Sequence, residues 1–550
     1  LKDLKVTDKD GNSVTLKQLD LDAKLKKATL TGDFAAENLP YKVTLGSDSF
    51  KTSESWQLKD ALYSYDGELG ARLEENGTKA HVTLWSPSAD QVDIIVYDKN
   101  NQDKVLAEHT LSKGPRGTWQ ADLLATDFGL ENLTGYFYQY RIKRGDQSVI
   151  VLDPYAKSLA AWNSDDASKG PEHKIAKAAF VDPANYGPKD LDYAKIPNFK
   201  SREDAIIYEA HVRDFTSDKA ISAELKHQFG TFAAFAERLD YLKDLGVTHI
   251  QLLPVLSYYF VNELQNGKRL DAYASSDSNY NWGYDPENYN VPDRQFAADQ
   301  KNPVAPILEL KKMIQTYHEA GIGVIMDVVY NHTYSSYSSP FQLSVPAYYY
   351  RMHDNGSFQD GSGCGNETAS EKEMYRKYMI DSLTYWAEEF GVDGFRFDLM
   401  GLHDVATMNA IRSAMDDIDP RILLYGEGWD MGIGLPVDQK AKKDNAALMP
   451  RIGFFNDNAR DAVKGAEVYG YINNGYVSGA PLEDQIAKSL LGSRGFVNYL
   501  MPGQVLNYIE AHDNYNLNDL MHHLHPHDSP EDIEKRIYLA NALNLSMQGM

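Results

Sequence analysis

Arg396 and Asp398 stand two positions apart in the otherwise apolar run GFRFDLMG, residues 394–401. Residues i and i+2 of a β-strand point to the same face, so a strand here projects a guanidinium and a carboxylate together. A neighbouring cation favours the ionised form of a carboxylate. An ionised carboxylate suits a nucleophile, or a group that stabilises a carbon as it becomes positive. The pair therefore predicts that role for Asp398.

A second acid, Glu427, lies in YGEGWD, residues 425–430, just before Trp429. Aromatic surroundings raise the pKa of a carboxyl and hold its proton at neutral pH. Breaking an acetal between two sugars needs one protonated carboxyl for the leaving oxygen and one ionised carboxylate for the anomeric carbon. The two acids therefore predict glycosidic bond cleavage, with retention if their carboxyls lie about 5 Å apart.

Further polar residues follow two other apolar runs. Asp327 and His332 belong to or follow residues 323–330, and His512 and Asp513 end a run that begins at residue 505. A structural network of ion pairs around Arg396 is the alternative interpretation. Recurrence at the ends of four expected strands favours a reaction site, in which Asp513 and the histidines bind sugar hydroxyls.

Strands and helices alternate after about residue 200, which predicts a parallel (β/α) barrel. In such a barrel, chemistry lies at the carboxyl ends of the strands. Closure requires a consistent strand number, so we expect an eighth strand from sequence beyond Met550. The expected strands are 205–212, 248–255, 323–330, 392–400, 422–430, 451–455 and 505–513, and the expected helices are 232–246, 307–321, 373–391, 404–418 and 532–547.

The region before about residue 160 has a different pattern. AHVTLWSPSADQVDIIVYD, residues 80–98, alternates apolar and polar positions around a turn, and several such runs predict an all-β sandwich. The chain is therefore expected to be multidomain, with a small unit at 1–55, a β-sandwich at 56–165 and a catalytic barrel, incomplete at its C-terminal end, at 166–550.

Composition limits the classes of partner. The net charge of −24 repels phosphate backbones and anionic lipid, so nucleic acid is excluded as a partner. Aromatic residues make up 11% of the chain, and such rings are platforms for the apolar faces of sugars. One cysteine excludes an internal disulfide, and no run reaches the about 18 apolar residues of a membrane span. The start, Leu1-Lys2-Asp3, is no signal peptide and suits the mature part of an exported protein.

Four motifs resemble, in order, the four short regions of the α-amylase superfamily of glycoside hydrolases: DVVYNHT (327–333), GFRFDLMG, YGEGWD and EAHDN (510–514). The resemblance implies that Asp398 is the nucleophile, Glu427 the general acid/base and Asp513 the stabiliser of the transition state. Asp327 would support the site. Residues expected to bind substrate are His332, Arg396, Trp429, His512 and Asn514.

YNWGYDP, residues 280–286, resembles the signature of type I pullulanases, which hydrolyse α-1,6 links in pullulan, amylopectin and glycogen. By this resemblance Tyr284 stacks on the sugar at the cleaved position, and Asp285 lies close by. The alternative is an aromatic loop that only packs on the barrel rim. Surface-anchored streptococcal pullulanases are the most similar group, which implies an extracellular or cell-surface location.

The sandwich is similar to the carbohydrate-binding module that precedes the barrel in debranching and branching enzymes, and Trp85 could be a core residue or a sugar platform. A C-terminal β domain usually follows the barrel, so it is expected beyond residue 550. No cofactor is required. A structural calcium ion is left open, because no local pattern identifies its ligands. HHLHPH, residues 522–527, is interpreted as a solvated loop, not a metal site.

Two alternatives to a debranching hydrolase remain. A glycogen-branching-type transglycosylase would use the same acids, but YNWGYDP argues against it. A glycan-binding adhesin would have an inactive barrel, and the complete set of acids argues against that. In each case the expected partner is an α-glucan polysaccharide or oligosaccharide, together with the missing C-terminal part of the same protein.

Overall fold

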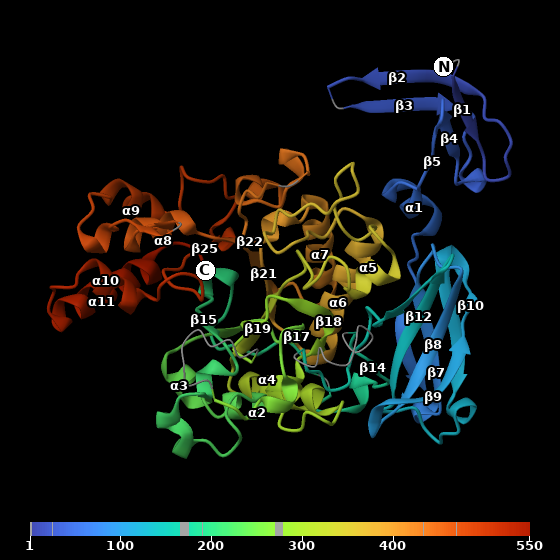
Figure 1. Ribbon diagram of the computed structural model, residues 1–550. Helices are drawn as coiled ribbons and strands as arrows, with labels where there is room; N and C mark the ends of the chain where they lie inside the picture. The colour runs from blue at the N-terminus through green and yellow to red at the C-terminus, as the bar shows by residue number, and fades with distance from the viewer. Residues whose placement is uncertain are drawn as a thin grey trace. The chain divides into compact units, whose positions relative to one another are not determined.

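The computed structural model describes residues 3–24, 26–164, 175–189, 191–269, 279–432, 434–468 and 470–550 (Figure 1). The predicted boundary between residues 165 and 166 lies outside the described residues. Two compact units are present, one of Leu1–Asp66 with Lys372–Met374 and one of Gly67–Glu371 with Tyr375–Met550. The first includes helix α1 (Trp56–Tyr63), and the second holds both the sandwich and the barrel strands. The predicted three-domain boundaries stay a prediction.

The first unit has a small apolar core of its own, centred on Val6, Tyr41 and Val43. Its strands form a three-stranded antiparallel sheet and a separate hairpin. The sheet order is β1 (Leu4–Thr7), β4 (Lys42–Leu45), β5 (Asp48–Lys51), and the hairpin pairs β2 (Leu16–Asp22) with β3 (Lys27–Gly32).

The second unit begins with the predicted β-sandwich, which is made of two antiparallel sheets. Residues 86–90 turn the chain from one sheet to the other, as their Ser-Pro-Ser-Ala-Asp sequence predicts. Trp85 is 2% exposed and packs edge-on against Tyr348 and Tyr349, so it is a core residue. The first sheet has the order β10 (Ser112–Lys113), β11 (Thr118–Leu124), β7 (Lys79–Trp85), β6 (Gly70–Glu74), and the second β13 (Gln147–Val151), β12 (Phe137–Arg144), β8 (Gln91–Asp98), β9 (Asn101–Thr110), with β14 (Ala178–Ala179) beside β12.

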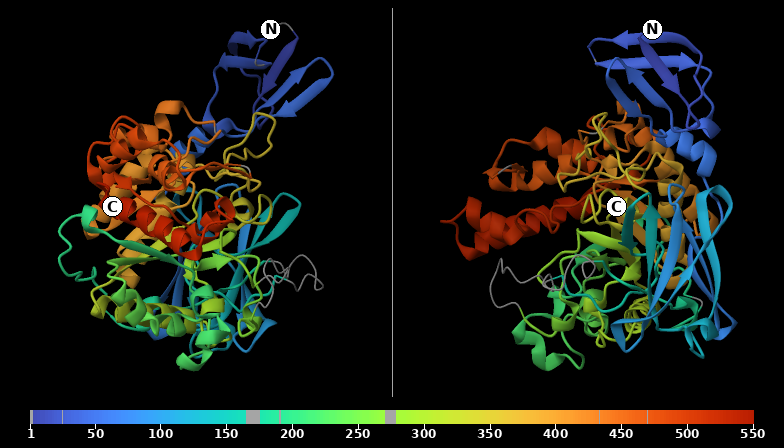
Figure 2. Two further views of the ribbon diagram at one scale, coloured as in Figure 1. Left: turned by 90° about the vertical axis from the view of Figure 1, so that its left-hand side faces the viewer. Right: turned by 45° about the vertical axis from the view of Figure 1, so that its right-hand side comes forward.

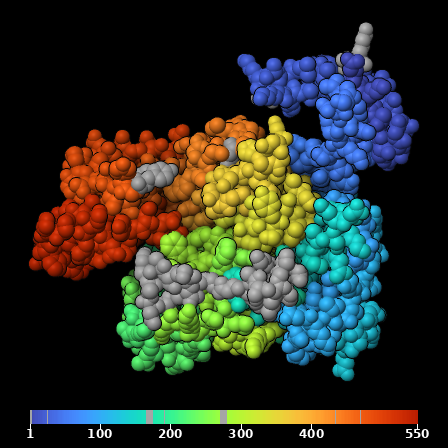
Figure 3. Space-filling model, in the orientation of Figure 1, coloured from blue at the N-terminus to red at the C-terminus, as the bar shows by residue number. Residues whose placement is uncertain are grey.

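Hydrogen bonds join the sandwich to the barrel. Arg144 at the end of β12 donates from Nη1 to the carbonyl of Leu343 at 3.1 Å, and from Nη2 to the carbonyl of Ser344. Ser86 Oγ donates to the same Ser344 carbonyl at 2.7 Å. These acceptors lie on α5 (Pro340–Ser344), and Figure 3 shows the cyan edge of the sandwich against the yellow segment that contains α5.

Seven strands of the described residues form the barrel sheet, all parallel and in chain order, as the sequence predicts. The right-hand view of Figure 2 shows the blue and cyan strands of the sandwich beside the green-to-red part of the chain that contains this sheet. The strands from β16 to β25 are buried on both faces, which is why the sequence shows short continuous apolar runs, whereas β15 at one end of the sheet is only partly buried. The antiparallel pair β17 (Leu256–Tyr258) and β18 (Pro286–Pro292) is inserted after the second strand. The sheet order is β15 (Ile207–Ala210), β16 (His249–Leu252), β19 (Gly323–Val328), β20 (Gly394–Phe397), β21 (Leu423–Gly426), β22 (Gly453–Phe455), β25 (Val505–Leu506).

Helices connect the barrel strands, and local side chains cap the N-termini of several of them, though not of α3, α4 or α9. Asp404 accepts from Thr407 N before α7, and Ser529 accepts from Asp532 N before α11. α8 to α11 share a separate small apolar core with Val463, Leu520 and Ile533. The helices are α2 (Phe232–Ala236), α3 (Leu239–Asp244), α4 (Ala305–Glu319), α6 (Glu373–Phe390), α7 (Val405–Ile418), α8 (Asp457–Lys464), α9 (Glu483–Leu490), α10 (Leu517–Leu524) and α11 (Pro530–Ser546).

The single helix predicted at 232–246 is wrong, because the chain forms α2 and α3 there. The carbonyl of Phe235 accepts the hydroxyl of Tyr317 at 3.0 Å and the N–H of Arg238 at 3.0 Å. This carbonyl is therefore drawn out of the i to i+4 pattern, and the helix breaks at Arg238, whose ψ is 8°.

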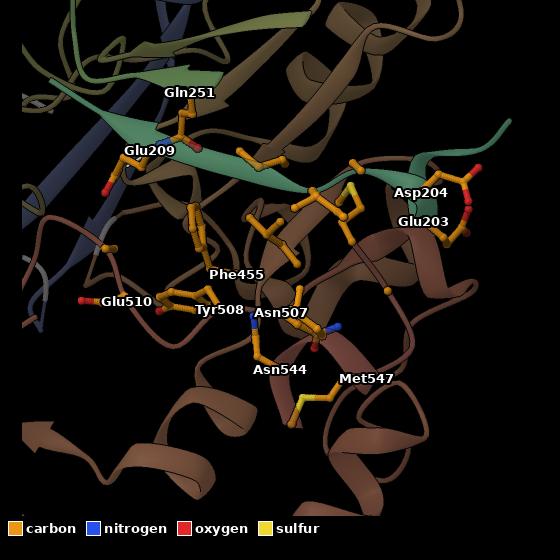
Figure 4. Close-up of a pocket in the computed structure, with 18 residues that line it drawn as sticks. Glu203, Asp204, Glu209, Gln251, Phe455, Asn507, Tyr508, Glu510, Asn544 and Met547 are labelled. Carbon is orange, nitrogen blue, oxygen red and sulfur yellow. Dashed lines mark hydrogen bonds between the residues drawn. The ribbon is translucent and has the colours of Figure 1, made fainter. Parts of the chain in front are cut away.

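Strands β15 and β25 are the two ends of the sheet, and the described residues contain no strand between them. A cavity of about 540 Å³ lies there, lined by residues of β15 and by those that follow β25 (Figure 4). Met550 bonds along β25, with its N–H donating to Val505 at 2.8 Å and its carbonyl accepting from Asn507 at 2.9 Å. No helix in the described ranges is long and apolar enough to cross a membrane.

Candidate active site

Arg396 is the centre of the site, on β20 and 2% exposed. Its Nη1 donates to Asp398 Oδ1 at 2.8 Å and to Asp327 Oδ1 at 3.0 Å, and its Nη2 lies 2.8 Å from Glu427 Oε1. The parallel register explains this convergence, since Asp327 on β19 lies beside Arg396 and Glu427 follows β21 on the other side. One guanidinium therefore brings three acids from three neighbouring strands together.

Asp398 has a second donor. Asn331 Nδ2 donates to its Oδ2 at 2.8 Å and to its backbone carbonyl at 3.0 Å. The Asp398 N–H donates to Val328 at 3.0 Å, which continues the β19–β20 pairing beyond the strand. The carboxylate is thus oriented by Arg396 and Asn331, and it remains 8% exposed.

Glu427 is 7% exposed and has a raised pKa. Burial is the main cause, Arg396 opposes it, and the charges of Asp398 and Asp513 add to it. Its Oε2 accepts the N–H of Leu399 at 2.9 Å. Leu399 has a φ of 42°, a left-handed conformation that a leucine rarely adopts and that turns its N–H to this acid. Of the two central acids, Glu427 is therefore the one suited to hold a proton.

Tyr284 covers this group from the loop before β18. Its hydroxyl donates to Asp327 Oδ2 at 2.7 Å, and its ring stacks on His512 with centroids 5.1 Å apart. The Arg396 guanidinium carbon lies 5.9 Å from the centre of the Tyr284 ring. His332 Nε2 lies 2.7 Å from the Tyr284 carbonyl, and burial lowers the pKa of His332. The structure thus brings both predicted histidines to Tyr284.

Glu209 on β15 was not among the predicted site residues. It contacts His512 through both carboxylate oxygens, each at 2.8 Å. On its other side, His512 Nε2 lies 3.6 Å from Asp513 Oδ1, and the Asp513 side chain is 57% exposed. The rule used for four other strands, a polar residue at the carboxyl end, identifies Glu209 when it is also applied to the first strand.

Asp285 does not join the acids around Arg396. Its Oδ2 accepts the N–H of Phe260 at 2.7 Å, and its Oδ1 accepts Asn281 Nδ2 at 2.9 Å. Burial raises the pKa of Asp285 to about 6, although these hydrogen bonds oppose it. In this structure Asp285 therefore holds the loop that carries Tyr284.

A cavity of about 510 Å³ opens on the site. Its wall also includes charged residues of α8, among them Asp457 and Arg460. In the described ranges, no group of three or more His, Cys, Asp or Glu residues could hold a metal ion, and calcium stays a prediction. The predicted residues that line the cavity are Arg396, Glu427, Trp429, Asp513 and Asn514.

The parallel barrel strands carry acids grouped around one arginine at their carboxyl ends, and a β-sandwich precedes them. This combination is typical of the α-amylase class of glycoside hydrolases. Comparison agrees with this class. Residues 200–355 match the family described as alpha amylase, catalytic domain, and residues 68–156 match carbohydrate-binding module 48, the isoamylase N-terminal domain.

Individual relatives indicate a narrower family within this class. Pullulanase A of Streptococcus pneumoniae serotype 2 is 47% identical over all of this chain, and the chain spans 44% of that relative. The pullulanase of Bacillus subtilis is 34% identical over 89% of this chain and 65% of its own length. The crystal structure of the Group B Streptococcus pullulanase SAP is 44% identical, with a TM-score of 0.94 over all of this chain and 70% of that one. The chain belongs to the pullulanase family of the α-amylase superfamily.

Proposed function

We propose that this chain is the catalytic part of a debranching hydrolase that cleaves α-1,6-glucosidic links in pullulan, amylopectin and glycogen. The observation that carries the proposal is the single guanidinium of Arg396 shared by Asp398 and Glu427. Sharing one guanidinium keeps the two acids near each other, as double displacement with retention requires.

In the first step Asp398 attacks the anomeric carbon while Glu427 gives its proton to the departing glycosidic oxygen. The carbon–oxygen bond of the branch breaks, and a covalent glycosyl–Asp398 ester forms. Because its pKa is raised, the Glu427 carboxyl holds the proton that it donates. Arg396 and Asn331 hold the attacking carboxylate in place. Asp513 stabilises the positive charge that develops on the sugar.

In the second step Glu427, now ionised, takes a proton from a water molecule as the water oxygen attacks the anomeric carbon. The ester breaks, Asp398 leaves as a carboxylate, and Glu427 regains its proton. Each group returns to its first state, so the reaction needs no cofactor, and a calcium ion would be structural.

The substrate class rests on the YNWGYDP loop and on the relatives. Tyr284 offers a ring near Arg396 on which a sugar can stack. Trp429 and Asn514 line the cavity, and His332 and His512, which contact Tyr284, are proposed to provide further contacts. The pullulanase SAP of Group B Streptococcus was also solved in complex with maltotetraose. We propose an α-glucan as substrate, an extracellular or cell-surface location, and a further C-terminal part of the same protein as partner.

The test uses the full-length protein with pullulan. Maltotriose release supports debranching, chain transfer without new reducing ends supports a branching transglycosylase, and binding without turnover supports an adhesin. Asp398→Asn should lower kcat by several orders of magnitude, because it removes the nucleophile, and leave glucan binding nearly intact. Turnover at the wild-type rate in this variant would contradict the assignment of Asp398.

A further inference from the structure

Glu209, near the end of β15, directs both of its carboxylate oxygens at one residue. Oε2 accepts the backbone N–H of His512 at 2.8 Å, and Oε1 lies 2.8 Å from the ring Nδ1. One bond fixes the main chain of His512 and the other fixes the rotation of its ring. Glu209 therefore determines where the imidazole points.

Glu209 is itself supported by neighbouring strands. Gln251 on β16 donates to Glu209 Oε1 at 3.1 Å, and Gln251 accepts the hydroxyl of Tyr425 at 2.6 Å. Gln251 is 3% exposed and Tyr425 is fully buried. Figure 4 shows Gln251 next to Glu209 at the edge of the cavity beside β15. A buried chain of bonds of this kind holds a side chain in one position.

His512 in turn contacts two residues of the site, Asp513 and Tyr284. Its Nε2 lies 3.6 Å from Asp513 Oδ1, and its ring stacks on Tyr284 with an angle of 25° between the planes. The imidazole thus lies between the carboxylates of Glu209 and Asp513, and both of its nitrogens are close to an acid. This surrounding favours a ring that carries a proton on each nitrogen.

We propose that Glu209 is a positioning residue of the reaction, which holds His512 as an imidazolium and through it sets the positions of Asp513 and Tyr284. The inference rests on the proposed function, because Asp513 and Tyr284 act on the sugar there. Glu209 itself acts only through His512.

The protonation of His512 is consistent with this geometry. Burial lowers the pKa of His512, but the hydrogen bond and the charge of Glu209 outweigh burial and raise the pKa to about 9. The same bonds lower the pKa of Glu209 against its burial. Titratable and charged groups that face His512 are Glu209 and His211 of the first strand and its loop, Asp327 of β19, Arg396 of β20, Tyr284, and the adjacent Asp513.

Glu209→Gln in the full-length protein tests the proposal. The amide has the same shape, but it cannot accept from both the backbone N–H and the ring N–H of His512. We expect kcat/KM on pullulan to fall about 10- to 100-fold, mainly through kcat, because the site is misaligned while the glucan contacts remain. Without the charge of Glu209, His512 should lose its proton at lower pH. This deprotonation should add to the loss of the Glu427 proton and move the basic limb of the pH profile to lower pH. Glu209→Asp keeps the charge and should restore that limb.

Glu203→Gln is the matched control, because Glu203 lines the same cavity but lies at its other end, away from Glu209 (Figure 4). It should leave kcat, KM and the pH profile unchanged. The protonation of His512 can also be followed by histidine NMR of the wild type, which needs no variant of Glu209. The His512 signal is assigned by its loss in His512→Gln. That signal should titrate near pH 9.

Two results would overturn the inference: a wild-type kcat and pH profile in a folded Glu209→Gln protein, or a wild-type His512 that titrates near pH 6.5. Absence of pullulan hydrolysis by the wild type would instead contradict the proposed function. The NMR titration tests the state of His512 in that case as well.

Discussion

Arg396 bonds Asp398 through Nη1 and Glu427 through Nη2, each at 2.8 Å, so the two acids of the reaction are spaced by the two ends of one planar group. Lysine keeps the charge but offers a single point of contact. Arg396→Lys should therefore lower kcat on pullulan about 100- to 1,000-fold, because the acids lose their shared support. Initial rates of reducing-end release by the full-length protein measure this.

Arg412→Lys serves as the control for replacing a buried arginine. Arg412 is 3% exposed and donates to the carbonyl of Ile422 at 2.7 Å, outside the cavity that opens on the site. This variant should lower the unfolding temperature and keep kcat. A wild-type kcat in Arg396→Lys, or an equal loss in Arg412→Lys, would show that the spacing of the acids is unimportant.

Tyr284 makes two separable contributions, a hydroxyl on Asp327 and a ring on His512. Tyr284→Phe keeps the ring and removes a hydrogen bond to a buried carboxylate, so kcat/KM should fall no more than about 10-fold. Tyr284→Ala also removes the surface on which the sugar is proposed to stack, and should cost at least another 10-fold. Steady-state kinetics of both variants separate the two. Equal losses would mean that the ring has no stacking role.

Arg144 is expected to stabilise the joint between the sandwich and the barrel. Its guanidinium donates to the carbonyls of Leu343 and Ser344. In Arg144→Ala the half-buried Leu343 carbonyl loses this donor, and the Ser344 carbonyl keeps only the bond from Ser86. We expect a loss of about 1–3 kcal/mol in the free energy of unfolding. Denaturant unfolding measures it. Arg72→Ala, which removes a half-exposed sandwich arginine paired with Glu68 and Glu74, is the comparison, and an equal loss there would contradict a specific role for Arg144.

The sequence predicted the seven strands and their order because each strand is a short apolar run, and all but the end strand β15 are buried on both faces. It also placed Asp327, Asp398 and Glu427 correctly at neighbouring strand ends. The spacing of Arg396 and Asp398 predicts only their mutual contact. The bonds from Arg396 to Asp327 and Glu427 depend on the register between strands, which no local pattern contains.

Two features depended on contacts between distant residues. The helix predicted at 232–246 breaks because a tyrosine on α4 bonds to one of its carbonyls. Asp285 is adjacent to Tyr284 in sequence, yet its carboxylate bonds to Phe260 and Asn281. In both cases the local sequence allows several conformations, and tertiary hydrogen bonds select one of them.

Two buried histidines predict a loss of stability in acid. His249 and His403 are fully buried, and burial lowers their pKa values to about 4 and about 3. Neither ring nitrogen of His403 has a hydrogen-bond partner among the described residues. Since the folded pKa lies below the unfolded value of about 6.5, only the unfolded state takes up protons between pH 6.5 and 4. The free energy of unfolding is therefore highest with respect to these two histidines above pH 6.5, and it falls as the pH drops toward 4.

The test compares denaturant unfolding at pH 7 and pH 5 for the wild type, His403→Leu and His522→Gln. Each buried histidine should account for about 2 kcal/mol of the difference, because one pKa unit corresponds to about 1.4 kcal/mol. His403→Leu should remove its share of the difference, whereas His522, which is exposed on α10, should have no effect when replaced. If His403→Leu shows the same difference between the two pH values as the wild type, the acid sensitivity arises elsewhere, and the carboxylates of the ion pairs become the groups to test.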